Sequence, residues 1–144
     1  MKDRPTRITK VLSANDTGET GGHQSGILVP REARLLAFFP SLNDREKNPR
    51  CLLHFVDDWH ERWAFAFIYY NNRFFGGTRN EYRLTRMTEF FRRRNAQPGD
   101  SLILERDEHG AYRIGFERFD TPAASTSGTA TRLRLGTSWR VIDI

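Results

Sequence analysis

Short apolar or alternating runs, separated by turn-forming residues, dominate the chain and predict a mainly β protein. Residues 6–13 ("TRITKVLS") alternate and are rich in β-branched side chains, and residues 26–30 ("GILVP") form a short apolar run. The runs 50–56 ("RCLLHFV") and 62–70 ("RWAFAFIYY") follow each other closely and predict a pair of neighbouring strands. Residues 98–118 predict a turn, a strand, a hairpin turn at "DEHG" and a second strand.

Helical spacing of apolar residues occurs in two places. Residues 30–40 ("PREARLLAFFP") predict one short helix bounded by prolines, and residues 87–95 ("MTEFFRRRN") predict a second, with Thr88 as its N-cap. Residues 120–131 are small and polar and predict a flexible loop, after which residues 132–144 offer one or two closing strands. About seven strands and two short helices in a single domain, residues 1–144, predict a closed or half-closed barrel.

The polar segments 13–26 and 71–83 do not fit this pattern of strands and helices. The first has four glycines in fourteen residues and almost nothing to bury. In the second, an Asn-Asn and a Gly-Gly doublet interrupt the strand pattern and leave a polar run exposed. Loops of this length are uncommon in a compact domain unless they are functional or disordered. Both segments are therefore candidates for function.

The composition limits the size and class of the protein. With 144 residues, of which 38% are hydrophobic and 12% aromatic, the chain can bury one ordinary core. Cys51 is the single cysteine, can form no internal disulfide and is expected in the core. No apolar run approaches the roughly 20 residues of a membrane helix, so we expect a soluble, intracellular protein. Core or barrel-end positions are expected for the aromatic residues Phe38, Phe39, Trp59, Trp63, Phe65 and Phe67.

Positive charge is concentrated in two places. The net charge is +5, residues 73–94 hold seven arginines against two glutamates, and residues 1–10 hold four cations against one aspartate. Arginine supplies 20 of the 23 cations, and its planar fork can donate two parallel bonds to guanine or phosphate. This distribution indicates a surface that binds nucleic acid. For Arg92, Arg93 and Arg94 we expect a solvated helix end instead.

The stretch "TRNEYR" (78–83) holds donors and acceptors that suit base edges. Arg79 and Arg83 have the paired donors that match guanine O6 and N7. Glu81 can accept from cytosine N4, and Asn80 suits adenine or a phosphate. The Glu81 carboxylate would be repelled by phosphates. A contact with a cytosine amino group would explain why a carboxylate lies within a basic segment. The alternative is that Glu81 simply pairs with Arg79 or Arg83, and the spacing leaves both interpretations open.

Three quoted segments carry a resemblance to known proteins. "KVLSANDTGETGGHQSGILVP" (10–30) and "IYYNNRFFGGTRNEYRLTR" (68–86) resemble, nearly residue for residue, the N-terminal effector-binding domain of the EcoRII restriction endonuclease family. "EFFRRRNAQPGDSLILE" (89–105) resembles plant B3 transcription-factor domains, which share that family's DNA-binding pseudobarrel. The resemblance implies a seven-stranded, B3-like pseudobarrel that clasps double-stranded DNA in the major groove with two arms.

The resemblance also implies which residues contact DNA. In that family each arm recognises one half of an almost palindromic CC(A/T)GG site, so we expect this site or a related short G·C-rich one. Departures from the family pattern occur at Gly77, where the relative has a lysine, and at Leu28, where it has a tyrosine. From the N-arm (about 10–25) the candidates are Lys10, Ser13, Asn15, Asp16, His23 and Gln24, and from the C-arm (71–83) they are Arg73, Thr78, Arg79, Asn80, Glu81 and Arg83.

Three N-arm candidates have an alternative interpretation. Asn15 and Asp16 can each form a turn with the local backbone, and for Asp16 we favour that structural role. His23 lies between Gly22 and Gln24 in a segment with little to bury, so a DNA contact is favoured over a core position.

A nuclease site is not visible in the sequence. The family's catalytic domain holds magnesium with an acidic pair and a lysine, but Lys2, Lys10 and Lys47 do not follow a carboxylate at that spacing. His54 and His60 lack the clustered partners of an HNH site. We therefore expect a DNA-recognition domain with no cofactor, whose Mg²⁺ belongs to an attached C-terminal nuclease domain, in a prokaryotic cytoplasm. The alternatives are a complete small nuclease with an unrecognised site and a protein-interaction module.

Overall fold

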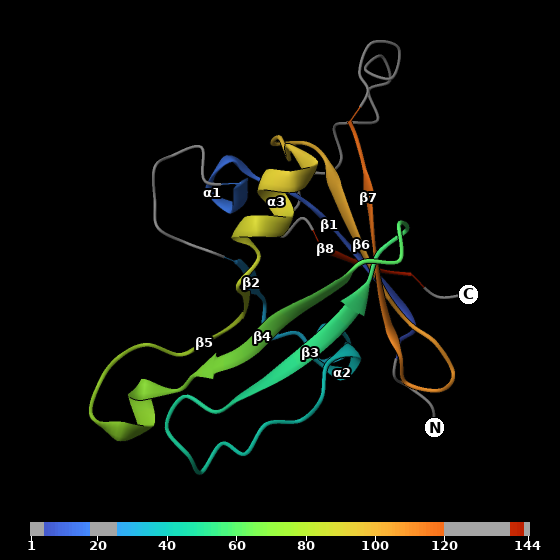
Figure 1. Ribbon diagram of the computed structural model, residues 1–144. Helices are drawn as coiled ribbons and strands as arrows, with labels where there is room; N and C mark the ends of the chain where they lie inside the picture. Colours follow the sequence, from blue (N-terminus) through green and yellow to red (C-terminus); the bar gives the residue numbers. More distant parts are fainter. Residues whose placement is uncertain (1–4, 18–25, 120–138, 143–144) are drawn as a thin grey trace.

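A computed structural model describes residues 5–17, 26–119 and 139–142 (Figure 1). Within these residues, one sheet of eight strands has the order β2-β5-β4-β3-β7-β6-β1-β8. Every neighbouring pair is antiparallel except β3 and β7. The strands are β1 (Arg7–Val11), β2 (Ile27–Val29), β3 (Arg50–Val56), β4 (Arg62–Tyr70), β5 (Glu81–Thr85), β6 (Ser101–Arg106), β7 (Tyr112–Glu117) and β8 (Trp139–Ile142).

Short helices lie between the strands in the same part of the chain. They are α1 (Ala14–Thr17), α2 (Ala33–Phe38), the 3-10 helix η1 (Asn72–Phe75) and α3 (Thr88–Arg94). The N-cap of α2 is Glu32, whose side chain accepts from the backbone N–H of Leu35. The N-cap of α3 is the buried Met87 and makes no side-chain cap bond, so the prediction of Thr88 as the cap is wrong by one residue. The Met87 side chain packs in the core, and this packing fixes the position at which α3 begins.

The sheet curls so that its two terminal strands approach each other. The indole Nε1 of Trp139 on β8 donates to the backbone oxygen of Leu28 on β2 at 3.0 Å. A curled sheet encloses one core, and fully buried Phe38, Phe55, Phe65 and Phe67 lie in it. The predictions of a mainly β protein and a half-closed barrel are confirmed.

The strand count differs from the predicted seven because of β5. The sequence predicts an irregular segment to residue 83, but Glu81–Thr85 pairs with both β4 and β2. Tyr82 and Leu84 point toward the core, and the residues that alternate with them, Glu81, Arg83 and Thr85, are polar. A strand with so few apolar residues looks like a loop in the sequence. The short helix α1 is likewise absent from the predicted elements.

The predicted hairpin at residues 107–110 is present. Asp107 accepts from the backbone N–H groups of His109 and Ala111 at 2.8 and 2.9 Å, and Gly110 has a φ of +86°. A positive φ favours glycine, which explains the sequence signal at this turn. The predicted loop 120–131 lies outside the described residues.

Two predictions about the core need correction. Trp59 follows β3 at a turn and is 67% exposed, although the sequence favours a core or barrel-end position. Cys51 is half-buried and packs at the edge of the core, because it lies near the start of β3, next to the exposed Arg50. The other predicted core aromatics, Phe38, Phe39, Phe65 and Phe67, are buried, and Trp63 is partly buried against the core.

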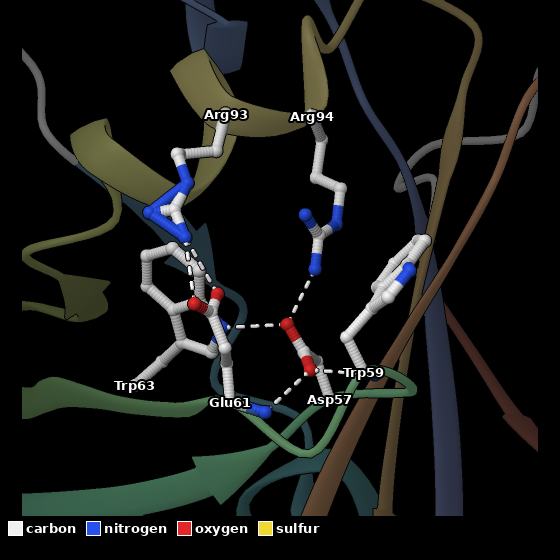
Figure 2. Close-up of polar contacts among 6 residues, drawn as sticks. All are labelled: Asp57, Trp59, Glu61, Trp63, Arg93 and Arg94. Carbon is white, nitrogen blue, oxygen red and sulfur yellow. Dashed lines mark hydrogen bonds and ion pairs between the residues drawn. The ribbon is translucent and has the colours of Figure 1, made fainter.

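The end of α3 is not the solvated arginine cluster that the sequence predicts (Figure 2). Arg94 forms an ion pair with Asp57, which is 2% exposed, and its guanidinium lies 4.2 Å from the ring centroid of Trp59. Arg93 bonds both carboxylate oxygens of Glu61 at 2.6 and 2.8 Å. These contacts fasten α3 to the β3–β4 turn. The expectation of a solvated side chain fits Arg92, which pairs with Glu89 on the helix surface, and Arg93, whose side chain is 44% exposed, but not Arg94.

Candidate nucleic-acid interface

The register of β2, β5 and β4 puts the central candidates on one face of the sheet. Glu81 lies opposite Tyr70, and Arg83 lies opposite both Ile68 of β4 and Leu28 of β2. Alternate residues of β5 pack against the core, so Glu81 and Arg83 project from the outer face. The C-arm joins this face directly, because η1 and residues 76–80 connect β4 to β5 (Figure 1).

A single oxygen of Glu81 binds two arginines. Its Oε2 accepts from Arg79 Nη2 at 2.8 Å, from Arg79 Nε at 3.1 Å and from Arg83 Nε at 3.1 Å. The ion pairing that the sequence left open is therefore present. Within the described part of the chain, the Oε1 atom of Glu81 and the two terminal nitrogens of Arg83 have no partner. These atoms have no partner there, but the side chains are largely covered, since that of Arg83 is 14% exposed and that of Glu81 is 30% exposed.

The charge state of this cluster is fixed at neutral pH. Burial alone would raise the pKa of the Glu81 carboxyl, but the hydrogen bonds and positive charges of Arg79 and Arg83 outweigh it and lower the pKa below its ordinary value of 4.5. The guanidinium of Arg79 also stacks on Tyr70, with its Cζ 3.8 Å from the ring centroid. The side chains are thus held in place while Arg79 remains 44% exposed.

Asn80 belongs to a second set of contacts at the base of the C-arm. With its amide nitrogen donating to the Tyr69 hydroxyl at 2.6 Å, its oxygen accepts from Arg73 at 3.1 Å and from Arg31 at 3.3 Å. The Tyr69 ring stacks on Tyr82 with centroids 4.2 Å apart. Asn80 and Arg73 hold each other in this arrangement, and contacts of either residue with DNA stay predictions.

The described part of the N-arm is built around Asp16. Asp16 Oδ2 accepts from the backbone N–H of Ser13 at 2.9 Å, and Ser13 Oγ accepts from the N–H of Asp16 at 3.1 Å, which is a capping box. Lys10 is 7% exposed, and its Nζ lies 2.9 Å from Asp16 Oδ2. The turn favoured for Asp16 is therefore present. The burial of Lys10 favours support of α1 over the predicted DNA contact, and the exposed Asn15 on α1 remains a candidate.

Two of the remaining candidate DNA contacts lie in the described part of the chain, and two lie outside it. Thr78 and Arg73 are exposed in the C-arm, as a contact with a ligand requires. His23 and Gln24 lie outside the described residues, so their roles stay predictions.

The sequence assigns no function to Asn71, yet it organises the base of the C-arm. Asn71 is fully buried. Its Oδ1 accepts from Asn48 N at 2.7 Å, and its Nδ2 donates to the backbone oxygens of Glu46 at 2.8 Å and Asp44 at 3.3 Å. These bonds tie the segment before β3 to the start of the arm. The Asn-Asn doublet is visible in the sequence only as a turn signal, and the stacking role of Tyr70 has no sequence signal.

The described ranges contain no group of three or more His, Cys, Asp or Glu residues that could hold a metal ion. None of their helices is long and apolar enough to cross a membrane.

Comparisons with known sequences agree with the resemblance of the two arm segments. A family model described as "Restriction endonuclease EcoRII, N-terminal" matches residues 5–117. Type II restriction enzyme EcoRII of Escherichia coli is 51% identical over 84 residues, which are 56% of this chain and 20% of that enzyme. Auxin response factor 4 of Arabidopsis thaliana is 31% identical over 122 residues, which are 85% of this chain and 14% of that protein. The chain therefore spans a small part of the length of these relatives.

Solved structures with the same fold include a B3 domain. The Arabidopsis FUS3–DNA complex aligns with a TM-score of 0.62 at 20% identity and covers 78% of this chain and 96% of that chain. The B3 domain of UbaLAI restriction endonuclease with cognate DNA aligns with a TM-score of 0.53 at 25% identity and covers 80% of this chain and 69% of that chain. The predicted B3-like fold is confirmed.

Proposed function

Because this chain belongs to the family of EcoRII restriction endonuclease N-terminal domains, we propose that it binds double-stranded DNA sequence-specifically. The proposed surface is the outer face of β5 together with the C-arm, assisted by the N-arm. Three solved relatives with this fold are described as complexes with DNA, which supports the same ligand class here. The net charge of +5 favours association with phosphates.

The arrangement at Glu81 carries this proposal. One carboxylate oxygen orients Arg79 and Arg83, while within the described residues the second oxygen and the outer nitrogens of Arg83 have no partner. A guanidinium supplies the two donors that guanine O6 and N7 accept, and a carboxylate oxygen accepts from cytosine N4. A fixed pair of opposite charges can thus recognise adjacent G·C pairs in the major groove.

The proposed target is CC(A/T)GG or a related short G·C-rich site, with one arm on each half. Arg79, Glu81 and Arg83 are the proposed base contacts of the C-arm, and His23 is the proposed contact of the N-arm. The 51% identity with EcoRII of Escherichia coli supports a related site. Gly77 and Leu28 replace a lysine and a tyrosine of the family pattern, and we expect each replacement to remove one DNA contact and to lower the affinity.

The proposed role is target recognition within a larger restriction endonuclease. The relative from Escherichia coli is about five times as long as the matched region, which supports an attached nuclease domain in the same polypeptide. Magnesium would serve that nuclease domain, and DNA binding by this chain needs no metal. We accordingly expect the same dissociation constant with EDTA as with magnesium, and a cytoplasmic location on bacterial DNA.

Equilibrium binding tests the proposal. The purified chain is titrated against a duplex of about 20 base pairs containing CCAGG and against a scrambled duplex of equal composition, over a series of salt concentrations. The expected result is a preference for the target of about a thousandfold or more. Equal affinity for both duplexes contradicts it. Cleavage of either duplex in magnesium would identify a nuclease, and absence of binding would favour a protein-interaction module.

A further inference from the structure

A row of side chains extends the recognition face beyond the C-arm. Register pairs Leu28 with Arg83, Arg83 with Ile68, and Ile68 with Arg50. Four neighbouring strands, β2, β5, β4 and β3, thus contribute one residue each to the same line across the sheet. Because directly opposite residues point to the same face, Arg50 shares the outer face with Arg83.

Arg50 is an exposed cation whose terminal nitrogens have no partner among the described residues. Its Nε donates to the backbone oxygen of Asn48 at 3.4 Å, which orients the guanidinium without neutralising it. Across the described ranges no carboxylate pairs with Arg50, whereas Arg79 and Arg83 share Glu81. A guanidinium that is exposed, oriented and not neutralised is the side chain expected at a phosphate.

The separation between Arg83 and Arg50 fits the cross-section of a duplex. Strands lie about 4.8 Å apart, so two strand spacings separate these residues by roughly 10 Å. The major groove is about 12 Å wide, so the sugar–phosphate backbone lies several ångströms to the side of a side chain in the middle of the groove. When Arg83 contacts a base, Arg50 lies over the flanking strand of the duplex.

The backbone that carries Arg50 is anchored to the C-arm. Asn71 binds Asn48 and Glu46 through its buried amide, and Tyr69 N donates to Pro49 O at 3.0 Å. In Figure 1 the segment between α2 and β3 lies beside η1. Arg50 therefore keeps a fixed position relative to the proposed base contacts.

We propose that Arg50 is a phosphate contact of this domain, on the strand that flanks the C-arm and outside both arms. This inference rests on the proposed function, since it takes the outer face of β5 as the face toward DNA. A phosphate contact contributes equally on every sequence and places the base-reading side chains in register with the duplex.

The test compares Arg50→Ala with Arg62→Ala. Arg62 begins β4 on the same outer face, is exposed and has no partner in the described part of the chain, and it lies six residues from Ile68, about 20 Å along the strand. Both variants remove one positive charge, and thermal unfolding verifies that both fold. Dissociation constants are measured on the CCAGG duplex and the scrambled duplex as a function of salt.

The expected result is a loss of roughly tenfold for Arg50→Ala on both duplexes, as for one charge-assisted hydrogen bond. The slope of log affinity against log salt should fall by about one. Equal, small effects of both variants overturn the inference while the wild-type preference for the target still stands. A loss confined to the target duplex also overturns it, because that would make Arg50 a base contact. Failure of the proposed function gives a different result, in which the wild-type chain holds both duplexes equally.

Discussion

Arg79 donates two hydrogen bonds to a single oxygen of Glu81, at 2.8 Å from Nη2 and 3.1 Å from Nε. An exposed ion pair of this kind contributes little to stability, on the order of 1 kcal/mol or less. The pair instead orients the two arginine side chains, because the same Glu81 oxygen also accepts from Arg83. The three side chains form one rigid unit at the start of β5, so a change in one should alter recognition more than folding.

Arg83→Ala should weaken binding to the target by about 1–3 kcal/mol and relax selectivity at one base pair. The reason is that both terminal nitrogens of Arg83 have no partner in the described structure. Dissociation constants on duplexes that carry each single base-pair substitution give the measurement. Arg92→Ala is the control, because Arg92 is an exposed arginine on α3 whose partner is Glu89. An equal loss on every duplex would contradict base recognition by Arg83.

Asp57→Asn should destabilise the fold by about 3 kcal/mol. Asp57 is buried and binds Arg94 and the indole N–H of Trp63, and an amide nitrogen in place of one oxygen would face these donors (Figure 2). Urea unfolding gives the free-energy change. The control is Glu61→Gln, because the pair of Glu61 with Arg93 is nearly half-exposed and should contribute less than about 1 kcal/mol. Equal effects of the two variants would show that burial of the Asp57 pair does not matter.

The contribution of Asp57 should also depend on pH. Burial alone would raise the pKa of Asp57, but the hydrogen bonds from Trp63, Glu61 and Trp59 and the charge of Arg94 outweigh it and lower the pKa below 3.8. A group with a lowered pKa in the folded state stabilises the protein above its unfolded-state pKa and loses this contribution as the pH falls through the folded-state value. The difference in unfolding free energy between wild type and Asp57→Asn should therefore be constant near neutral pH and shrink below about pH 4. A difference that grows with acidity would contradict the assigned cause.

Asn71→Ala should destabilise the protein by about 1–3 kcal/mol, because it leaves the backbone groups of Asn48 and Glu46 without the amide that satisfies them. The C-arm should also lose its fixed base, so DNA affinity should fall. Asn72→Ala is the matched control, since the buried Oδ1 of Asn72 has no hydrogen-bond partner within the described residues. Urea unfolding and DNA titration of both variants provide the comparison, and a larger effect of Asn72→Ala would count against the role of Asn71.

Asp16→Asn should destabilise the N-arm region by about 3 kcal/mol, because it removes the carboxylate that lies 2.9 Å from the buried ammonium of Lys10. Lys10→Met in the same chain should restore part of the loss, since the buried charge is then gone. Urea unfolding of the single and double variants tests the coupling. Strictly additive losses would show that the two side chains act independently.

The sequence predicts most strands because their apolar residues alternate with a period of two and turn signals separate them. It does not predict β5, where only Tyr82 and Leu84 face the core and the outward residues are polar. The donors and acceptors of residues 78–83 and the resemblance of the arm segments select Arg79, Glu81 and Arg83 as candidates, and ion pairs through Glu81 bring them together. The roles of Asp57 and Asn71 could not be predicted. Each depends on contacts between residues more than twenty positions apart.

Selection of bound duplexes from a random pool by the purified chain is the decisive measurement of base recognition. We expect the wild type to enrich one short G·C-rich motif, and Arg83→Ala to enrich a motif that has lost one specified position. A bound pool without any enriched motif, at a salt concentration where binding persists, would contradict the claim that this face recognises base pairs.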